Sequence, residues 1–212
     1  MWTDEDLVEE TEWTRKFSKQ DGSGTYHQSK FLEGEATITA AELAERWPDW
    51  TECERHDFCS AVSCGNVNDS TEIFRFLAND TTDLIRSTIA LGVAVSLDAD
   101  EAYPILNQWA SDAQIGNRAN YHQAIMVTKH PDALETLKSE FDKLCAHPQL
   151  MDDSDWYNDI AMDLVWCIQH LLELEQPAAE LNPAYSKLKT HPCQKIREQV
   201  DHWLAKSFDY GG

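Results

Sequence analysis

The fold class of this chain is decided by the stretch Thr82-Asp83-Leu84-Ile85-Arg86-Ser87-Thr88-Ile89-Ala90-Leu91-Gly92-Val93-Ala94-Val95-Ser96-Leu97. Asp83 and Arg86 flank an aliphatic face, and this pattern predicts a helix over 82–97. The most apolar part, Ile89 to Leu97, is far too short to span a bilayer. We therefore expect a helix of a soluble domain and no membrane-spanning segment.

Similar helical patterns recur from residue 70 onward. The further helices are predicted at Thr71–Ala78, Glu101–Ala110, Asn117–Lys129, Asp132–Cys145, Asp155–Glu175, Asn182–Lys189 and Cys193–Ser207. Their connections are mostly two to eight residues long, which is typical of antiparallel neighbours. The sequence therefore predicts an all-α fold of antiparallel helix pairs.

The spacing of these helices resembles a HEAT-type α-solenoid over about residues 70–207. Residues 82–94 resemble the first helix of such a repeat and 98–109 the second, and Arg86 lies 32 residues before Arg118. The resemblance implies helix pairs stacked as a short solenoid that recognises proteins along a concave surface. An irregular helical bundle is the alternative fold, and some proteins of the solenoid architecture are enzymes.

We expect one helical domain, 1–212, in which residues 1–69 are less regular than the repeat-like helix pairs of 70–207. Thr3 is predicted to cap a first helix, and 25–32 is the one stretch compatible with a short hairpin. Two capping boxes predict two further helix starts: Thr39-Ala40-Ala41-Glu42 and Thr51-Glu52-Cys53-Glu54.

The composition excludes several classes of fold and partner. With 42% hydrophobic and 26% charged residues the chain is globular, and its eight Gly and seven Pro are few for a sandwich or barrel. The 38 acidic and 17 basic side chains give a formal net charge of −21, which repels nucleic-acid phosphates. The same field would speed encounter with a basic protein partner, or it could serve solubility alone.

The N-terminus predicts no secretory signal, because Met1-Trp2-Thr3-Asp4-Glu5-Asp6 has no basic region and no apolar run behind it. We therefore expect a cytoplasmic location. In that compartment the six Cys are expected to be reduced thiols rather than disulfides.

Metal-binding chemistry is the first alternative that the sequence raises. One group of ligand-type residues lies within a single predicted helix: Cys53, His56, Cys59 and Cys64. A single helix cannot wrap four ligands around one ion, so we interpret the cysteines as small core residues. The dipeptide His56-Asp57 is compatible with a metal-dependent phosphohydrolase that uses His122 or His170, but no spacing selects these residues. We therefore predict no metal and no cofactor.

Three connections carry the same dipeptide: His130-Pro131, His147-Pro148 and His191-Pro192. Proline suits the first helical position, and it pushes the preceding residue out of the helical region. We interpret these pairs as helix-start signals, and a metal site shared by the three histidines is the alternative.

An acidic column supplies the candidate partner-binding residues: Asp152, Asp155, Asp159 and Asp163, with Trp156 beside them. The last three Asp recur every four residues on one face of the predicted helix 155–175. Like charges at this spacing destabilise a helix by roughly 0.2–0.5 kcal/mol per pair. A solvated face, a partner surface and a metal or catalytic cluster are the three interpretations, and the partner surface is the functional prediction.

The sequence contains no Gly-rich phosphate loop and no nucleophile elbow, and it identifies no catalytic residue. The leading hypothesis is a cytoplasmic protein-binding module whose acidic surface docks a basic partner. A bacterial immunity protein that neutralises a cationic toxin is one concrete version, and a scaffold or adaptor is another. The alternative is a metal-dependent hydrolase or small-ligand enzyme with His and Asp on a helical scaffold.

Overall fold

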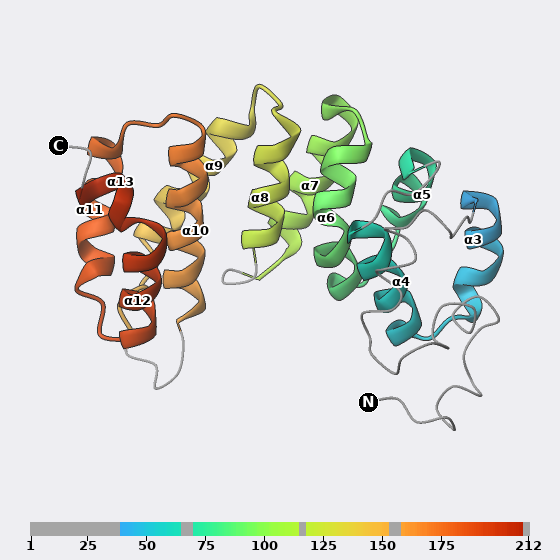
Figure 1. The fold of residues 1–212 in the computed structure, drawn as a ribbon, viewed down its shortest axis with the longest axis horizontal. Coiled ribbons are helices and arrows are strands. Elements are labelled where there is room, and N and C mark those ends of the chain that lie inside the picture. Colours follow the sequence, from blue (N-terminus) through green and yellow to red (C-terminus); the bar gives the residue numbers. More distant parts are fainter. Residues whose placement is uncertain (1–38, 65–69, 115–117, 153–157, 210–212) are drawn as a thin grey trace. The chain divides into compact units, whose positions relative to one another are not determined.

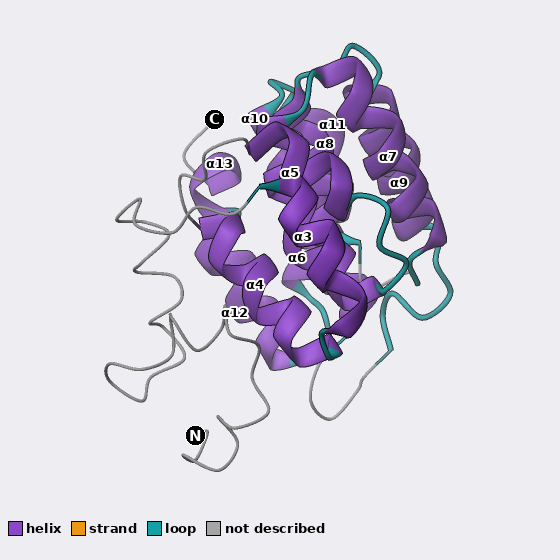
Figure 2. Ribbon diagram, turned by 90° about the vertical axis from the view of Figure 1, so that its right-hand side faces the viewer, coloured by secondary structure: helices purple, strands orange, loops and turns teal. Residues whose placement is uncertain are grey.

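The computed structural model describes residues 39–64, 70–114, 118–152 and 158–209 (Figure 1). Over these ranges the fold is all-helical and contains no strand, as Figure 2 shows, which confirms the predicted fold class at the level of secondary structure. The predicted helix after Thr3 and the hairpin at 25–32 lie outside the described residues. The chain divides into two compact units, Met1–Asp98 and Ala99–Gly212.

The first unit contains four α-helices and a 3₁₀ turn within its described residues. They are α3 (Ala40–Arg46), the 3₁₀ turn η2 (Trp47–Asp49), α4 (Glu52–Cys64), α5 (Ser70–Leu77) and α6 (Asp83–Ser96). Both capping boxes are confirmed. The backbone N–H of Glu42 donates to the Thr39 hydroxyl at 3.2 Å, and the backbone N–H of Thr51 donates to the Glu54 carboxylate at 2.7 Å.

Helix α6 is the centre of the first unit, since both α4 and α5 pack against it. The decisive stretch therefore forms the predicted helix, with Ile85, Ile89 and Val93 fully buried. Gly92 gives α5 room to approach, because a Cβ atom built there would lie 2.1 Å from Cε1 of Phe74.

The second unit contains seven helices among its described residues. They are α7 (Ala99–Asp112), α8 (Ala119–Thr128), α9 (Ala133–Cys145), α10 (Asp159–Glu173), α11 (Ala178–Lys189), α12 (Gln194–Trp203) and α13 (Ala205–Asp209). All the helices predicted here are present, although α10 and α11 each begin four residues from the predicted start and the helix predicted over 193–207 is divided into α12 and α13. Helix α10 begins at Asp159 because the Asn158 side chain caps it, accepting the Ala161 N–H at 3.0 Å. Helix α11 begins at Ala178 and contains Pro183 rather than starting beside it.

Helix α10 is the centre of the second unit, where it packs against α8, α9, α11 and α12. Its residues Leu164, Ile168 and Leu171 are fully buried in one core with Leu137 and Leu144 of α9. Burying one such Leu or Ile contributes about 1.5–3 kcal/mol relative to leaving it exposed. This core fixes α9 on α10, and α9 in turn carries most of the polar side chains described below.

An arginine near the start of three helices reaches back to the preceding connection. The Nε–H of Arg86 donates to the Asp80 carbonyl at 2.8 Å, and that of Arg118 donates to the Ala113 carbonyl at 3.0 Å. In α4 the Nε–H of Arg55 donates to the Trp47 carbonyl at 3.1 Å. Each bond gives a hydrogen-bond donor to a backbone carbonyl in the connection before the helix. It also fixes the direction in which the next helix starts.

The three His-Pro pairs share one turn geometry. In each, the backbone N–H two residues after the histidine donates to Nδ1, from Asp132 at 3.2 Å, Gln149 at 3.3 Å and Cys193 at 3.0 Å. The pairs at 130 and 191 lead directly into α9 and α12, which confirms the helix-start interpretation there. The pair at 147 instead opens a turn over 148–151.

In the described ranges, no helix combines the length and the apolar character needed to cross a bilayer.

Candidate functional site

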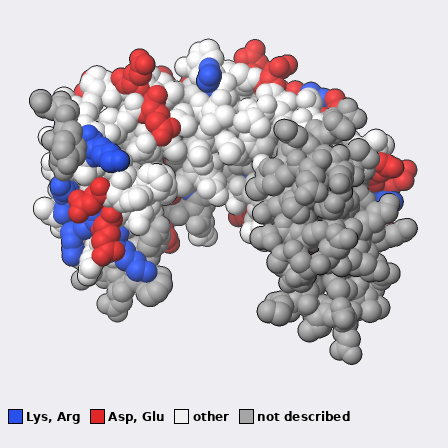
Figure 3. Space-filling model, in the orientation of Figure 1, with Lys and Arg blue, Asp and Glu red and all other residues white. Residues whose placement is uncertain are grey.

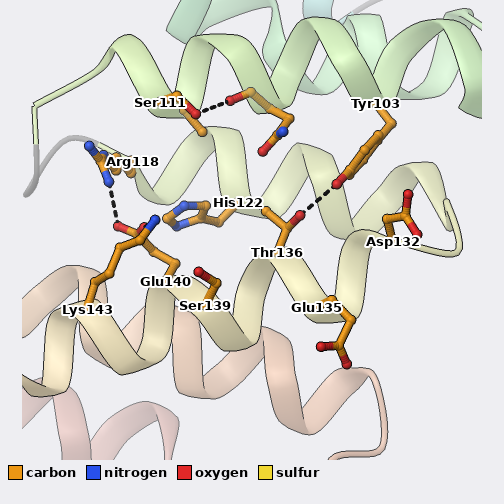
Figure 4. Close-up of a pocket in the computed structure, with 12 residues that line it drawn as sticks. Tyr103, Ser111, Arg118, His122, Asp132, Glu135, Thr136, Ser139, Glu140 and Lys143 are labelled. Atoms are coloured by element: carbon orange, nitrogen blue, oxygen red, sulfur yellow. Dashed lines mark hydrogen bonds and ion pairs between the residues drawn. The ribbon is translucent and has the colours of Figure 1, made fainter.

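A polar hollow of about 560 Å³ lies between α7 and α9, with the start of α8 as its floor (Figure 4). Arg118, His122, Glu140 and Lys143 line one end. Tyr103, Thr136, Asp132 and Glu135 line the other. The volume falls in the range of about 300–1,000 Å³ that is usual for ligand sites.

A buried ion pair dominates the first end. Nη1 of Arg118 donates to Oε1 of Glu140 at 2.8 Å, and Nζ of Lys143 lies 3.4 Å from the other Glu140 oxygen. Glu140 is nearly fully buried and Arg118 is 13% exposed, whereas Lys143 is 59% exposed. The buried carboxylate is therefore held by two cations, one of which faces solvent.

His122 lies beside this pair and is 2% exposed. Its Nδ1 has no hydrogen-bond partner among the residues that the structure describes, and Figure 4 shows the ring directed into the hollow. Burial lowers the pKa of His122 to about 4, against an opposing effect from Glu140 and with smaller lowering effects from His170, Arg118 and Lys143. The imidazole is therefore neutral at pH 7, with one nitrogen available as a donor and the other as an acceptor.

Aromatic and acidic side chains form the second end. The Tyr103 hydroxyl lies 2.7 Å from the Thr136 hydroxyl, and the Tyr103 ring stacks on His130 with centroids 4.1 Å apart. The His130 ring is framed by carboxylates, since Nε2 lies 3.6 Å from Asp100 and Nδ1 lies 3.9 Å from Asp132.

Three carboxylates at or beside this end face solvent, and two of them, Asp132 and Glu135, line the hollow. Asp100, Asp132 and Glu135 are 95%, 71% and 78% exposed, and Nζ of Lys138 lies 3.8 Å from Glu135. We refer to Tyr103, His130, Asp100, Asp132 and Glu135 as the aromatic–acidic cluster. A stacked pair of rings with surrounding carboxylates suits a cation, because ring faces and carboxylates both attract positive charge.

The predicted acidic column is not one exposed face. Asp159 is exposed in the first turn of α10, and Asp152 is exposed before the helix. Asp163 is 2% exposed, and its carboxylate accepts the Arg118 backbone N–H at 3.3 Å, so it belongs to the interior beneath the hollow. Asp155 and Trp156 lie outside the described residues.

The other candidate ligand groups do not converge. In the described part of the chain, no three His, Cys, Asp or Glu side chains are placed to hold a metal ion. Cys53 is exposed and Cys59 is buried, while the side chain of Cys64 is not described. Burial raises the pKa of the Cys59 thiol well above its usual range, which agrees with its interpretation as a core residue. His56 lies in the first unit, beside Asp57 at 3.8 Å.

Basic and acidic side chains alternate on α11 and α12, at the left of Figure 3. Lys187, Lys189 and Lys195 are exposed there together with Asp201, which lies 3.7 Å from Lys189. The strong net negative charge of the chain is therefore not spread evenly over the second unit.

Sequence reasoning missed most of the hollow. It named His122 only as a possible metal ligand and Arg118 only for its distance from Arg86. One signal was present in α9, where Glu140 occupies a position of the stripe Ala133, Leu137 and Leu144. A charged residue within a buried stripe indicates a buried partner, but the partner's identity depends on which helix packs opposite.

The comparisons with protein-family models, with curated proteins and with solved structures found no match to this chain.

Proposed function

We propose that this chain is a protein-binding module that docks a basic partner through the aromatic–acidic cluster of its second unit. The observation that carries the proposal is the stack of Tyr103 on His130 at 4.1 Å, with exposed carboxylates of Asp100 and Asp132 beside it. Aromatic anchors surrounded by charge complementary to the partner are the features that a protein interface of this kind needs.

The net charge of −21 supports the same proposal at longer range. An acidic molecule attracts a cationic partner before contact, and this raises the association rate most strongly at low salt. The aromatic–acidic cluster would then receive the partner's Lys or Arg side chains. Asp152 and Asp159 are also exposed, but they lie before and at the start of α10, away from this cluster, and Asp163 is buried.

We further propose that the scaffold is a short HEAT-like α-solenoid that works in the cytoplasm. The arginine that ties α4, α6 and α8 to the connection before each helix supports a repeating unit. The serial packing of α7 through α12 supports stacked pairs, although an irregular bundle would share it. The five cysteines whose side chains are described are all free thiols, which suits a reducing compartment.

Two biological roles fit such a module. An immunity-type inhibitor would cover the basic substrate channel of a cationic toxin, and an adaptor would hold a basic protein near another component. Both roles make the same physical demand, which is salt-dependent association with a basic protein. The metal-dependent hydrolase is less well supported, because no three-residue ligand group occurs among the described side chains.

The test starts from a basic protein that co-purifies in stoichiometric amount with the full chain from its source cells. Stopped-flow measurements at low and high salt give its association rate with the wild-type chain and with the double variant D132N/E135Q. We expect the variant to associate roughly tenfold more slowly at low salt and to lose part of the salt dependence.

The matched control is E45Q/D49N, which removes two charges from exposed side chains of the first unit. It should associate at a rate close to that of the wild type. The proposal is overturned if no basic protein co-purifies, or if D132N/E135Q associates as fast as this control at low salt.

A further inference from the structure

We propose that the hollow between α7 and α9 binds the C-terminal residue of a partner chain when that residue is Arg or Lys. The α-carboxylate would lie at the end formed by Arg118, His122 and Lys143, and the cationic group would lie at Asp132 and Glu135. The inference rests on the proposed function, since it names the segment of the basic partner that enters the site.

His122 is the observation that points to a ligand. A buried polar atom without a partner is rare in folded proteins, and Nδ1 of His122 is such an atom in the wall of a hollow. Because the ring is neutral, Nδ1 can carry the proton and donate it to an oxygen. A carboxylate oxygen at this position would satisfy the nitrogen without burying a further charge on the protein.

The side chains around His122 suit a carboxylate. Arg118 has five N–H donors, of which Nε–H is directed to Ala113 and one Nη1–H to Glu140. Lys143 presents its ammonium to solvent at the same end. Glu140 is already engaged by both cations, so an incoming carboxylate would meet donors that remain available on Arg118 and Lys143.

The opposite end requires a positive group. Asp132 and Glu135 are exposed carboxylates there, and Glu135 has the Lys138 ammonium 3.8 Å away. Glu135 and Lys143 are eight residues apart on α9, which corresponds to about 12 Å along the helix. A ligand that serves both ends is therefore a long zwitterion, with a carboxylate and a cation joined by a flexible chain.

A C-terminal Arg or Lys is such a zwitterion. The hollow opens to solvent along Ser111, Glu135 and Ser139, whose side chains are exposed, so the chain before the terminal residue has a way out. The volume of about 560 Å³ accommodates one such residue with water. An internal Arg or Lys would supply the cation alone and would leave His122 unsatisfied.

The test uses three acetylated pentapeptides that differ only at the last position: one ends in Arg with a free carboxylate, one in Arg amide and one in Ala with a free carboxylate. Isothermal titration calorimetry of the full chain measures each affinity. We expect the Arg acid to bind at least about tenfold more tightly than either other peptide, because each lacks one charge-assisted contact. Free L-arginine should bind more weakly than the Arg acid peptide.

Two variants and one spectroscopic readout locate the site. Lys143→Gln changes an exposed side chain and should reduce the preference for acid over amide by several-fold, while Lys206→Gln on α13 should leave it unchanged. The imidazole ¹⁵N shifts of His122 should change on addition of the Arg acid and not of the amide. This NMR measurement uses the wild-type chain, so it does not depend on the folding of a His122 variant.

Equal binding of the acid and the amide would overturn the inference while leaving the proposed function intact. Binding of free L-arginine as tight as that of the peptide would also overturn it, because the ligand would then be an amino acid rather than a chain end. If the basic partner associates but no peptide binds, the inference fails alone. If neither the partner nor any peptide binds, the proposed function fails as well.

Discussion

Buried histidines in the second unit differ in whether their ring nitrogens have partners. His191 is fully buried, and it uses both nitrogens, one for the Cys193 N–H and the other for the Leu150 carbonyl at 2.8 Å. His122 and His170 are also buried, yet in the described part of the chain Nδ1 of each lacks a hydrogen-bond partner. All three histidines are buried, so burial alone does not separate a structural histidine from one that could bind a ligand. The hydrogen bonds of the ring nitrogens do separate His191 from His122.

The first prediction at this scale concerns pH. The pKa of His122 falls from 6.5 to about 4 in the folded chain, so between these values the unfolded chain binds a proton that the folded chain does not. Stability should therefore decrease as pH falls from 6.5 to 4, and His122 should account for up to roughly 3 kcal/mol of the decrease. Urea unfolding of the wild type and of His122→Phe at pH 7, 5.5 and 4.5 measures this contribution.

His170 contributes in the same direction, because burial also lowers its pKa. His122→Phe should therefore reduce the pH dependence without abolishing it. Exposed His202→Gln is the control and should leave the dependence unchanged. Parallel curves for the wild type and His122→Phe between pH 7 and 4.5 would show that His122 does not resist protonation in the folded chain.

At the scale of single elements, the start of a helix can be predicted from the residues around it. The neighbouring helices that it packs against cannot be predicted in this way. The capping boxes at Thr39 and Thr51 placed two helix starts, because each box satisfies backbone groups within its own turn. The start of α11 was predicted four residues too late, because the helix contains Pro183 at its sixth position and continues before it. The prediction placed Asp163 on an exposed acidic column, whereas it is buried. A four-residue spacing shows that the Asp residues share one face of a helix, but it does not show which neighbouring helix covers that face.

The close approach of α5 to α6 gives the second prediction. Gly92→Ala would gain about 1 kcal/mol of helix propensity, but its new methyl group would lie 2.1 Å from Cε1 and 2.3 Å from Cζ of the buried Phe74 ring. Overpacking of this kind costs about 1–3 kcal/mol, so we expect a net loss of about 1 kcal/mol in the free energy of unfolding. Urea denaturation of the full chain measures it.

A double-mutant cycle separates the two contributions to this change. Phe74→Leu shortens the side chain that the new methyl group meets, so Gly92→Ala should become neutral or stabilising in that background. An equal loss in both backgrounds would show that the contact with Phe74 is not the cause of the loss.

At the scale of the whole molecule, the sequence contains the net charge and predicted the fold class. It did not predict the bounds of the two units or the hollow. The all-α fold follows from helical spacing repeated along the chain, and the net charge of −21 follows from a count of charged side chains. The boundary at residue 98 depends on which helices pack together, and the hollow depends on how α7, α8 and α9 are arranged. Both are set by contacts between segments that are far apart in the sequence. Neither the periodicity nor the composition of the sequence reveals such contacts.

The third prediction concerns the independence of the second unit. One hydrophobic core of this unit consists of buried residues between Leu137 and Leu204, all of which lie within the unit. A fragment over 99–212 should therefore give a helical circular dichroism spectrum and unfold in one cooperative thermal transition. The variant Leu171→Ala, which empties a fully buried site, should lower its stability by about 2–5 kcal/mol. A fragment without cooperative unfolding would show that the unit needs the rest of the chain.

The imidazole turns at His130, His147 and His191 have a consequence for protein design. Each needs only a histidine, a proline and the backbone N–H that follows, so the whole device is contained in three residues. It also fixes the tautomer, because an Nδ1 that accepts a hydrogen bond leaves the proton on Nε2. A His-Pro pair is thus a transferable module that starts a turn or helix and, in the same step, presents an imidazole N–H of known orientation.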